Sequence, residues 1–242
     1  MISAVVIAKN EEGNIENCLK NLNFCDEIII IDDYSADNTA KIAKNFTTKI
    51  YKRHLNYNFA AQRNYGLTKA SCEWILFVDA DEIVSNTLKA EILLKISQEN
   101  INGFYIKRRD IFLDRELKFG ETGNVKLLRL AKKDSGKWKR KVHEYWNIKG
   151  QTQELGSYLI HDKKQNLFEF VNKLNDYSTL HAQENEKENK KSNMFKIVLY
   201  PFLKFVDNYF LKLGFLDGIP GFINATLMSF HSFLAWSKEW IY

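Results

Sequence analysis

Three acidic residues follow the apolar segment 74–78, and their spacing suits the binding of a metal ion. Asp79, Asp81 and Glu82 come directly after the run WILFV. On an extended strand end Asp79 and Asp81 point to the same side, where two carboxylates can share one hard divalent cation. A cation held there could bind a diphosphate. The alternative is that these acids cap the next helix or lie in a solvated loop.

A second apolar segment, 28–31, also ends in acids, Asp32 and Asp33. In open parallel sheets, ligands bind beyond the carboxyl ends of the strands. The two acidic strand ends therefore predict one shared site.

The pattern of the first hundred residues indicates the elements that must position these acids. Apolar runs alternate with segments of helical periodicity, which favours βα units and a mainly parallel sheet. We expect strands at 2–8, 28–31, 49–52 and 74–78 and helices at 15–22, 40–46, 59–70 and 88–96. Ser35 or Asp37 could cap the second helix, and the fourth should begin near Ser85 or Asn86. The alternating segments 103–108 and 125–130 predict additional antiparallel strands.

Composition limits the class of protein. The chain has 242 residues, 45% of them hydrophobic, which suits one large globular domain or a domain with an appendage. A net charge of +5 is too small for a nucleic-acid-binding surface, but it is compatible with an anionic membrane face or anionic substrates. Cys18, Cys25 and Cys72 have no metal-site spacing, so we expect buried thiols in a reducing compartment. The first residues lack a basic leader, which indicates a cytosolic catalytic part.

The C-terminal region differs from the rest of the chain. The charged segment 184–192 predicts a boundary between a catalytic domain, 1–183, and a helical region, 193–242. Residues 219–236 contain no Asp, Glu, Lys or Arg, but a spanning helix needs about 20 apolar residues, and Pro220 interrupts this run. We favour amphipathic helices lying on a membrane, with a spanning helix, a docked soluble subdomain or a homodimer surface as alternatives.

Several motifs, in their order along the chain, resemble family 2 glycosyltransferases. They are KNEE at 9–12, DEIIIIDDYS at 26–35 with Asp37 and Thr39, AQRNYGL at 61–67, VDADE at 78–82, and Trp138 with VHE at 142–144. More narrowly, the chain resembles bacterial lipopolysaccharide-core β-1,4-glucosyltransferases, including the segment GFLDG at 214–218 followed by Gly221. The resemblance spans nearly the whole chain and is most specific as far as Glu144.

This resemblance implies the glycosyltransferase A fold, which is a Rossmann-like α/β architecture with a mainly parallel sheet and helices on both faces. It also implies a nucleotide-diphospho-sugar donor, a divalent cation (Mn²⁺ or Mg²⁺) and inversion at the anomeric carbon. Asp81, with Asp79 beside it, would hold the cation that stabilises the departing diphosphate. His161 could complete this metal site, although a lone histidine at a strand end is more often structural.

The resemblance also assigns the nucleotide site. Asp32 and Asp33 would accept hydrogen bonds from the base or ribose, unless they only cap the following helix. Ala8 and Glu11 would line the base. Arg63 would contact the base or a phosphate, or else lie on a solvated helix face.

Inversion by direct displacement requires a base for the acceptor hydroxyl group. The resemblance assigns this role to Glu144, with Glu82 as the second candidate; Glu82 could instead orient the metal site. Arg140 and His143 could contact the acceptor or a phosphate. Trp138 could stack on a sugar or pack in the core.

The expected function is transfer of a hexose, with UDP-glucose as the first donor to test, to a lipopolysaccharide-core or other lipid-linked acceptor at the cytoplasmic face of the bacterial inner membrane. One alternative is a sugar-phosphate nucleotidyltransferase, but such enzymes have a Gly-rich loop after the first strand, where this chain has KNEEG at 9–13. A non-catalytic, membrane-docked sugar-nucleotide or glycan-binding module is the other. A glycoside hydrolase fits less well, because Asp79 and Asp81 share one strand end.

Overall fold

The computed structural model describes residues 1–141, 144–162 and 167–241 and divides into two compact units. The first unit comprises Met1–Arg108 and Lys126–Lys163, and the second comprises Arg109–Val125 and Lys164–Tyr242.

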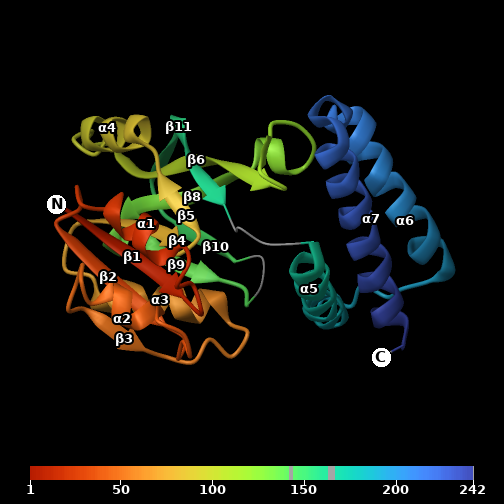
Figure 1. The fold of residues 1–242 in the computed structure, drawn as a ribbon, viewed down its shortest axis with the longest axis horizontal. Helices are drawn as coiled ribbons and strands as arrows, with labels where there is room; N and C mark the ends of the chain where they lie inside the picture. Colours follow the sequence, from red (N-terminus) through yellow and green to blue (C-terminus); the bar gives the residue numbers. More distant parts are fainter. Residues whose placement is uncertain (142–143, 163–166, 242) are drawn as a thin grey trace. The chain divides into compact units, whose positions relative to one another are not determined.

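A mixed sheet forms the centre of the first unit (Figure 1). Its strand order is β3-β2-β1-β4-β8-β6-β11-β5. The parallel half consists of β1 (Ile2–Ala8), β2 (Glu27–Asp32), β3 (Ile50–Lys52) and β4 (Trp74–Asp79). These strands follow the predicted apolar runs closely, because a strand buried on both faces is apolar along its whole length.

The other half of the sheet is antiparallel. It contains β5 (Glu82–Val84), β6 (Ile101–Phe112), β8 (Lys126–Lys132) and β11 (Gln151–Asp162). The strands β6 and β8 confirm the two predicted antiparallel segments. A separate ribbon joins β9 (Gly136–Lys139) to β10 (Tyr145–Ile148).

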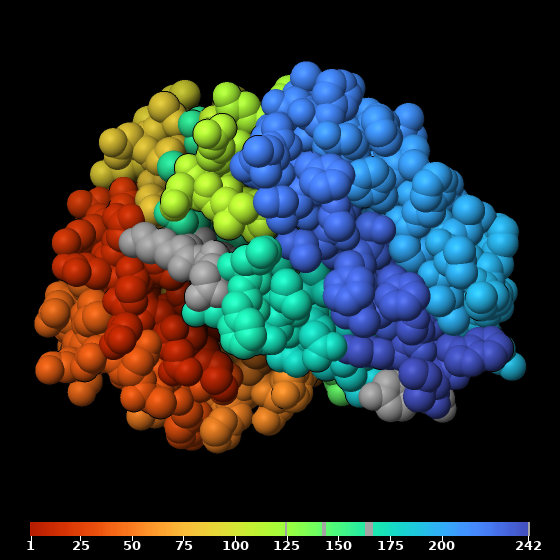
Figure 2. Space-filling view, turned by 45° about the vertical axis from the view of Figure 1, so that its right-hand side comes forward, coloured from red at the N-terminus to blue at the C-terminus, as the bar shows by residue number. Residues whose placement is uncertain are grey.

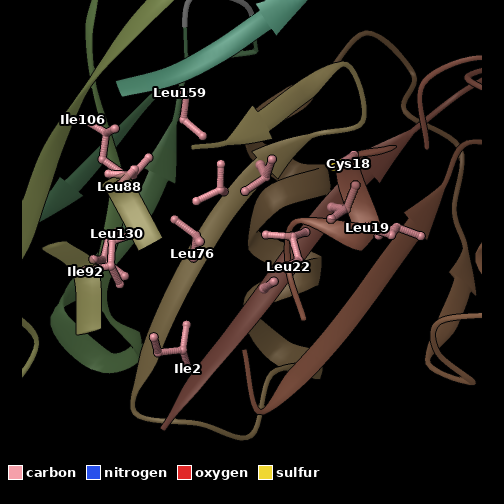
Figure 3. Close-up of a cluster of buried hydrophobic side chains, with 14 of the residues drawn as sticks. Ile2, Cys18, Leu19, Leu22, Leu76, Leu88, Ile92, Ile106, Leu130 and Leu159 are labelled. Carbon is pink, nitrogen blue, oxygen red and sulfur yellow. The ribbon is translucent and has the colours of Figure 1, made fainter. Parts of the chain in front are cut away.

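Helices cover both faces of the sheet, which confirms the predicted fold class. One face carries α1 (Ile15–Lys20), α2 (Thr39–Ala43) and α4 (Asn86–Lys95), and the other carries α3 (Phe59–Lys69). Successive strand residues point to opposite faces. Leu76 therefore packs against the first group of helices, whereas Phe77 packs on the side of α3. Figure 3 shows side chains of the first cluster, among them Ile2, Leu76, Leu88 and Leu130, converging from strands and helices.

Side-chain caps fix where α3 and α4 begin. The Asn58 side chain accepts a hydrogen bond from the Ala61 N–H at the start of α3, and Ser85 accepts one from Leu88 N–H at the start of α4. The predicted cap at Ser85 is thus confirmed. Helix α2 is shorter than predicted and has Asn38 at its N-cap position, while Asp37 accepts a hydrogen bond from the N–H of Thr39.

Three long helices dominate the second unit: α5 (Leu167–Lys187), α6 (Met194–Val206) and α7 (Gly218–Ile241). Helix α7 packs against both others, and the three lie side by side in Figure 2, in teal, light blue and dark blue. Tyr200 meets Trp236 edge to face at 5.4 Å between ring centroids, and Ser229 donates to the Pro201 carbonyl at 2.7 Å. The charged segment 184–192 includes the end of α5, which extends to Lys187, and the first residues of the connection to α6.

Short elements tie residues 109–125 into this helical unit. These are β7 (Arg115–Leu117), the 3₁₀ turn Thr122–Asn124, the π-helical turn Asp207–Leu211 and the 3₁₀ turn Gly214–Asp217. The Asp217 carboxylate accepts hydrogen bonds from the N–H groups of Lys118 and Phe119. Within the described ranges, no helix is both long enough and apolar enough to cross a bilayer.

Candidate functional site

The carboxyl ends of three parallel strands meet at one edge of the sheet. Ala8 is the register partner of Asp32, and Ile7 is the partner of Asp79. Neighbouring strands lie about 4.8 Å apart. The acidic ends of β2 and β4 therefore flank the end of β1, which confirms that the two acidic strand ends share one edge.

Asp32 and Asp33 have different surroundings at the end of β2. Asp33 accepts hydrogen bonds from Lys9 Nζ at 2.7 Å and from the Leu55 N–H at 3.0 Å. Burial alone would raise the pKa of Asp33, but these bonds lower it below its usual range. Oδ1 of Asp32 accepts from the Ser35 N–H, whereas its buried Oδ2 has no hydrogen-bond partner in the part of the chain that the structure describes. An unsatisfied buried carboxylate oxygen is a candidate acceptor for a ligand donor.

Asp79 lies between two guanidinium groups. Its Oδ1 is 2.9 Å from Arg63 Nη2, and its Oδ2 is 2.6 Å from Arg129 Nη2. Burial alone would raise the pKa of Asp79, but the charges of Arg129 and Arg63 hold it well below its usual range. Asp79 is therefore a carboxylate whose two oxygens both face arginine.

Glu82 contacts both Asp79 and Arg129. Its Oε2 accepts the Asp79 N–H at 2.9 Å, and its Oε1 is 3.3 Å from Arg129 Nη2. Glu82 is completely buried, and burial raises its pKa. A carboxyl group with no exposed surface cannot reach an acceptor, so Glu82 is unsuited to be the base and instead orients Arg129 and the end of β4.

Glu144 joins the same group of charges through Arg63, whose Nε is 3.1 Å from Glu144 Oε1. Arg63 is only 2% exposed, and its guanidinium group lies over the Trp138 ring at 4.7 Å from the centroid. The alternative of a solvated helix-face arginine is therefore wrong. Both Ala8 and Glu11 lie near the β1 end, where the Ala8 carbonyl accepts the Asp33 N–H and the Glu11 N–H donates to Thr39.

Asp81 forms a second, separate pair with His161. The sequence reading places Asp79 and Asp81 on one strand end, but β4 ends at Asp79 and Asp81 lies in the turn before β5. His161 near the end of β11 is the register partner of Glu82, which brings its Nε2 to 3.3 Å from Asp81 Oδ2. An oxygen and a nitrogen ligand so placed fit two positions around a divalent cation. Among the described residues, no group of three or more His, Cys, Asp and Glu side chains could hold a metal ion.

Trp138, Arg140 and His143 are the residues predicted to contact the acceptor or a phosphate. Trp138 is 6% exposed and packs against Trp146 and Phe77, which is the core alternative left open by the sequence and leaves no ring face for a sugar. Arg140 is exposed, with a positive φ of 69°. His143 lies outside the described residues.

Arg129 is the site residue that the sequence reading missed. It lies in β8, between Leu128 and Leu130, and is 4% exposed. A charge within an apolar strand must be paired, because an isolated buried charge is strongly disfavoured. A single arginine between two leucines is the sequence feature that could have indicated a buried charge at position 129. This feature does not identify Asp79 and Glu82 as its partners.

Comparison with known proteins identifies the family. The sequence model of the family described as "Glycosyl transferase family 2" matches residues 3–153, which is well over half of the chain. The matched range includes all the acids at this edge of the sheet. The chain belongs to glycosyltransferase family 2.

Relatives of this family 2 chain match it along nearly its whole length. The lipopolysaccharide core biosynthesis glycosyltransferase LpsC of Rhizobium meliloti (strain 1021) is 28% identical over 98% of this chain and 91% of that protein. An uncharacterized glycosyltransferase, RT0209 of Rickettsia typhi, is 26% identical over 98% of this chain and 86% of that protein. The crystal structure of S. aureus TarS 1-349 in complex with UDP-GlcNAc covers 96% of this chain and 81% of that chain, with a TM-score of 0.50 and 17% identity. This structural similarity supports the glycosyltransferase A fold.

Proposed function

We propose that this family 2 chain is an inverting, metal-dependent hexosyltransferase. It takes a hexose, with glucose as the first candidate, from a nucleotide-diphospho-sugar and transfers it to a lipopolysaccharide-core or other lipid-linked glycan. The observation that carries the proposal is the pairing of Asp81 with His161 beside the aligned ends of β1, β2 and β4. It offers metal ligands at the edge of a parallel sheet where a nucleotide binds in such folds.

The donor would be held at three points of this edge. The unpartnered Oδ2 of Asp32 would accept a hydrogen bond from the base or ribose, and Asp33 would keep Lys9 close to the same end. Asp81 and His161 would hold Mn²⁺ or Mg²⁺, with donor diphosphate oxygens and water as the other ligands. When bound, the cation neutralises charge that accumulates on the departing diphosphate.

Glu144 would be the base. Its carboxylate takes the proton of an acceptor hydroxyl group while the hydroxyl oxygen bonds to the anomeric carbon and the bond from that carbon to the diphosphate breaks. The products are the glycosylated acceptor and a nucleoside diphosphate. Attack from the side opposite the leaving group inverts the anomeric carbon. Asp79 faces Arg63 and Arg129, so its part would be to hold these two arginines in place at the end of β4.

Two comparisons support the choice of substrates. LpsC is named as a lipopolysaccharide core glycosyltransferase, which favours a core or lipid-linked acceptor. TarS was crystallised with UDP-GlcNAc, which favours a uridine nucleotide as the donor. We place this enzyme on the cytoplasmic face of the inner membrane, bound through exposed apolar side chains of α6 in the second unit, among them Phe195 and Phe202.

Purified enzyme provides the test. Asp81→Asn should abolish hexose transfer, and it should also abolish the slow hydrolysis of the donor that occurs without acceptor. Chelation of divalent cations should have the same two effects. Glu144→Gln should lower the rate of transfer by about 10²- to 10⁴-fold, the usual contribution of a general base. Glu154→Gln, which alters a glutamate paired with Lys107 and Lys126, is the matched control and should keep full activity. Full turnover by Glu144→Gln would overturn the base assignment.

The donor is found by measuring release of nucleoside diphosphate from a panel of nucleotide sugars with Mn²⁺, beginning with UDP-glucose. Binding of these donors without hydrolysis or transfer would favour a non-catalytic binding module. Release of pyrophosphate from a nucleoside triphosphate and a sugar phosphate would favour a nucleotidyltransferase.

A further inference from the structure

One buried arginine connects the proposed base to the acidic end of β4. Arg63 uses Nε to bind Glu144 at 3.1 Å and Nη2 to bind Asp79 at 2.9 Å. We infer that Arg63 is a positioning residue that fixes Glu144 at a set distance from the diphosphate end of the site, and that it is not a ligand of the nucleotide. This inference rests on the proposed function, in which Glu144 is the base.

Two carboxylates and two aromatic rings already hold the Arg63 guanidinium group. The side chain is 2% exposed, and its guanidinium group packs against Trp138 and Phe77 at 4.7 and 5.7 Å from the ring centroids. Nε and Nη2 are already bound to Glu144 and Asp79, and the remaining nitrogen, Nη1, is buried with no hydrogen-bond partner among the described residues. The two carboxylates and the two rings therefore account for the position of this group.

Helix α3, which carries Arg63, is hydrogen-bonded to the segment 138–141, which precedes Glu144. Asn64, the next residue of α3, exchanges two hydrogen bonds of 2.9 Å with the backbone of Trp138 in β9. At the start of α3, the Phe59 N–H donates to the Lys141 carbonyl at 3.0 Å. These contacts hold α3 against residues 138–141, which precede Glu144 in the chain.

The other partner of Arg63 is fixed as well. Arg129 binds the second oxygen of Asp79 at 2.6 Å, and Glu82 accepts from both Arg129 and the Asp79 N–H. Arg63 therefore connects Glu144 to a rigid group. Since Oε1 of Glu144 faces Arg63, Oε2 would take up the acceptor proton.

A guanidinium group is required for this role because two of its nitrogens bind two carboxylates at once in a fixed plane. A lysine ammonium keeps the charge but is a single point on a flexible stem. Arg63→Lys should therefore keep the fold and the charge balance yet fail to hold Glu144 at its set distance from Asp79.

The experiment measures kcat, KM for the donor, and the Kd of the nucleoside diphosphate with Mn²⁺ for full-length Arg63→Lys and Arg63→Gln. Misplacing a reacting group by about 1 Å costs about 100-fold in rate, so kcat should fall by about 10- to 100-fold, whereas KM and Kd should change by less than about threefold. Arg115→Gln, an exposed arginine of β7 in the second unit, is the control and should change none of these values. If Arg63→Gln fails to fold, Arg63→Lys still carries the test.

A double variant separates positioning from an independent role. When Glu144→Gln has removed the base, Arg63→Lys should lower the residual kcat by less than about threefold, because residues that act as one unit are not additive. Three results would each overturn the inference. The losses in kcat of Glu144→Gln and Arg63→Lys could multiply in the double variant, the Kd of the nucleoside diphosphate could weaken about tenfold in either Arg63 variant, or Arg63→Lys could keep the full kcat. These outcomes leave the proposed function standing, whereas full turnover by Glu144→Gln alone overturns the base assignment.

Discussion

At the scale of single residues, Glu27 shows how a buried acid joins distant parts of the chain. Its Oε1 accepts hydrogen bonds from Ser3 at 2.7 Å and from the Ser71 N–H at 2.8 Å, and its Oε2 binds Lys49 at 2.5 Å. Burial alone would raise the pKa of Glu27, but Lys49 and Ser3 lower it from 4.5 to about 2. Because the folded pKa is depressed, this stabilisation is present above pH 4.5 and is lost as the pH falls towards 2.

We therefore expect Glu27→Gln to destabilise the protein at pH 7 and to reduce the loss of stability between pH 5 and pH 2. The linkage sets an upper limit of about 3 kcal/mol, and screening of the half-exposed Lys49 reduces it. Urea unfolding at pH 7 and at pH 3 measures both effects. Glu16→Gln, which breaks an exposed pair with Lys20, should change stability by less than about 0.5 kcal/mol. An equal loss in the two variants at pH 7 would contradict the assignment.

Single residues also show where reading the sequence succeeds and where it stops. The acids at 32, 33, 79 and 81 can be recognised because each follows an apolar run, and a buried strand has few reasons to end in carboxylates. Their partners cannot be recognised in this way. Arg63 and Glu144 are 81 positions apart, and only the folded chain brings them to 3.1 Å. The pairing of Asp81 with His161 depends in the same way on the register of β5 and β11.

At the scale of elements, the close approach of α3 to β1 depends on Gly66. A Cβ atom at this position would lie 2.4 Å from Val5 Cγ1 in the packed core. Overpacking costs about 1–3 kcal/mol, which outweighs the gain of about 1 kcal/mol in helix propensity from Gly to Ala. Gly66→Ala should therefore lower the melting temperature, and displacement of α3 should also lower the activity that depends on Arg63.

Two variants test this cause. Val5→Ala removes the methyl group that Gly66→Ala meets, so the double variant should lose less stability than the sum of the two single losses. Gly13→Ala, where an added Cβ has no atom within 4 Å, should change stability by less than about 0.5 kcal/mol. Strict additivity of Val5→Ala and Gly66→Ala would show that steric contact is not the cause.

The strands β5, β9 and β10, which were not predicted, are short and lack a continuous apolar run. The strands β9 and β10 lie in the charged stretch around residues 137–148, where lysines on the exposed side mask the alternation. Among the described residues of this stretch, Trp138 and Trp146 are the buried ones. The strand β5 has only three residues, and its pairing with β11 supplies its stability. The parallel strands were predictable because burial on both faces makes them apolar without interruption.

At the scale of the whole molecule, the second unit exposes more apolar surface than a soluble helical unit needs. Phe195, Val198 and Phe202 follow the spacing of one helix face on α6 and are 62%, 59% and 62% exposed. Leu211 and Ile219, beyond the end of α6, are also largely exposed. Large apolar patches on soluble proteins mark interaction sites. The lipid-linked acceptor that we propose makes the membrane the expected partner.

Changing these three α6 side chains to serine should weaken binding of the full-length protein to vesicles that contain anionic lipid. Each fully buried apolar side chain contributes about 1.5–3 kcal/mol, so even partial insertion of three predicts at least about a tenfold loss in sedimentation with vesicles. The control is Leu93→Ser with Leu94→Ser on α4, two exposed leucines of the first unit whose loss should leave vesicle binding unchanged. If the α6 variant instead lost self-association in light scattering while vesicle binding stayed the same, the surface would join two copies of the chain. Transfer to a soluble acceptor fragment should survive the α6 changes, because Asp81, His161 and Glu144 all belong to the first unit.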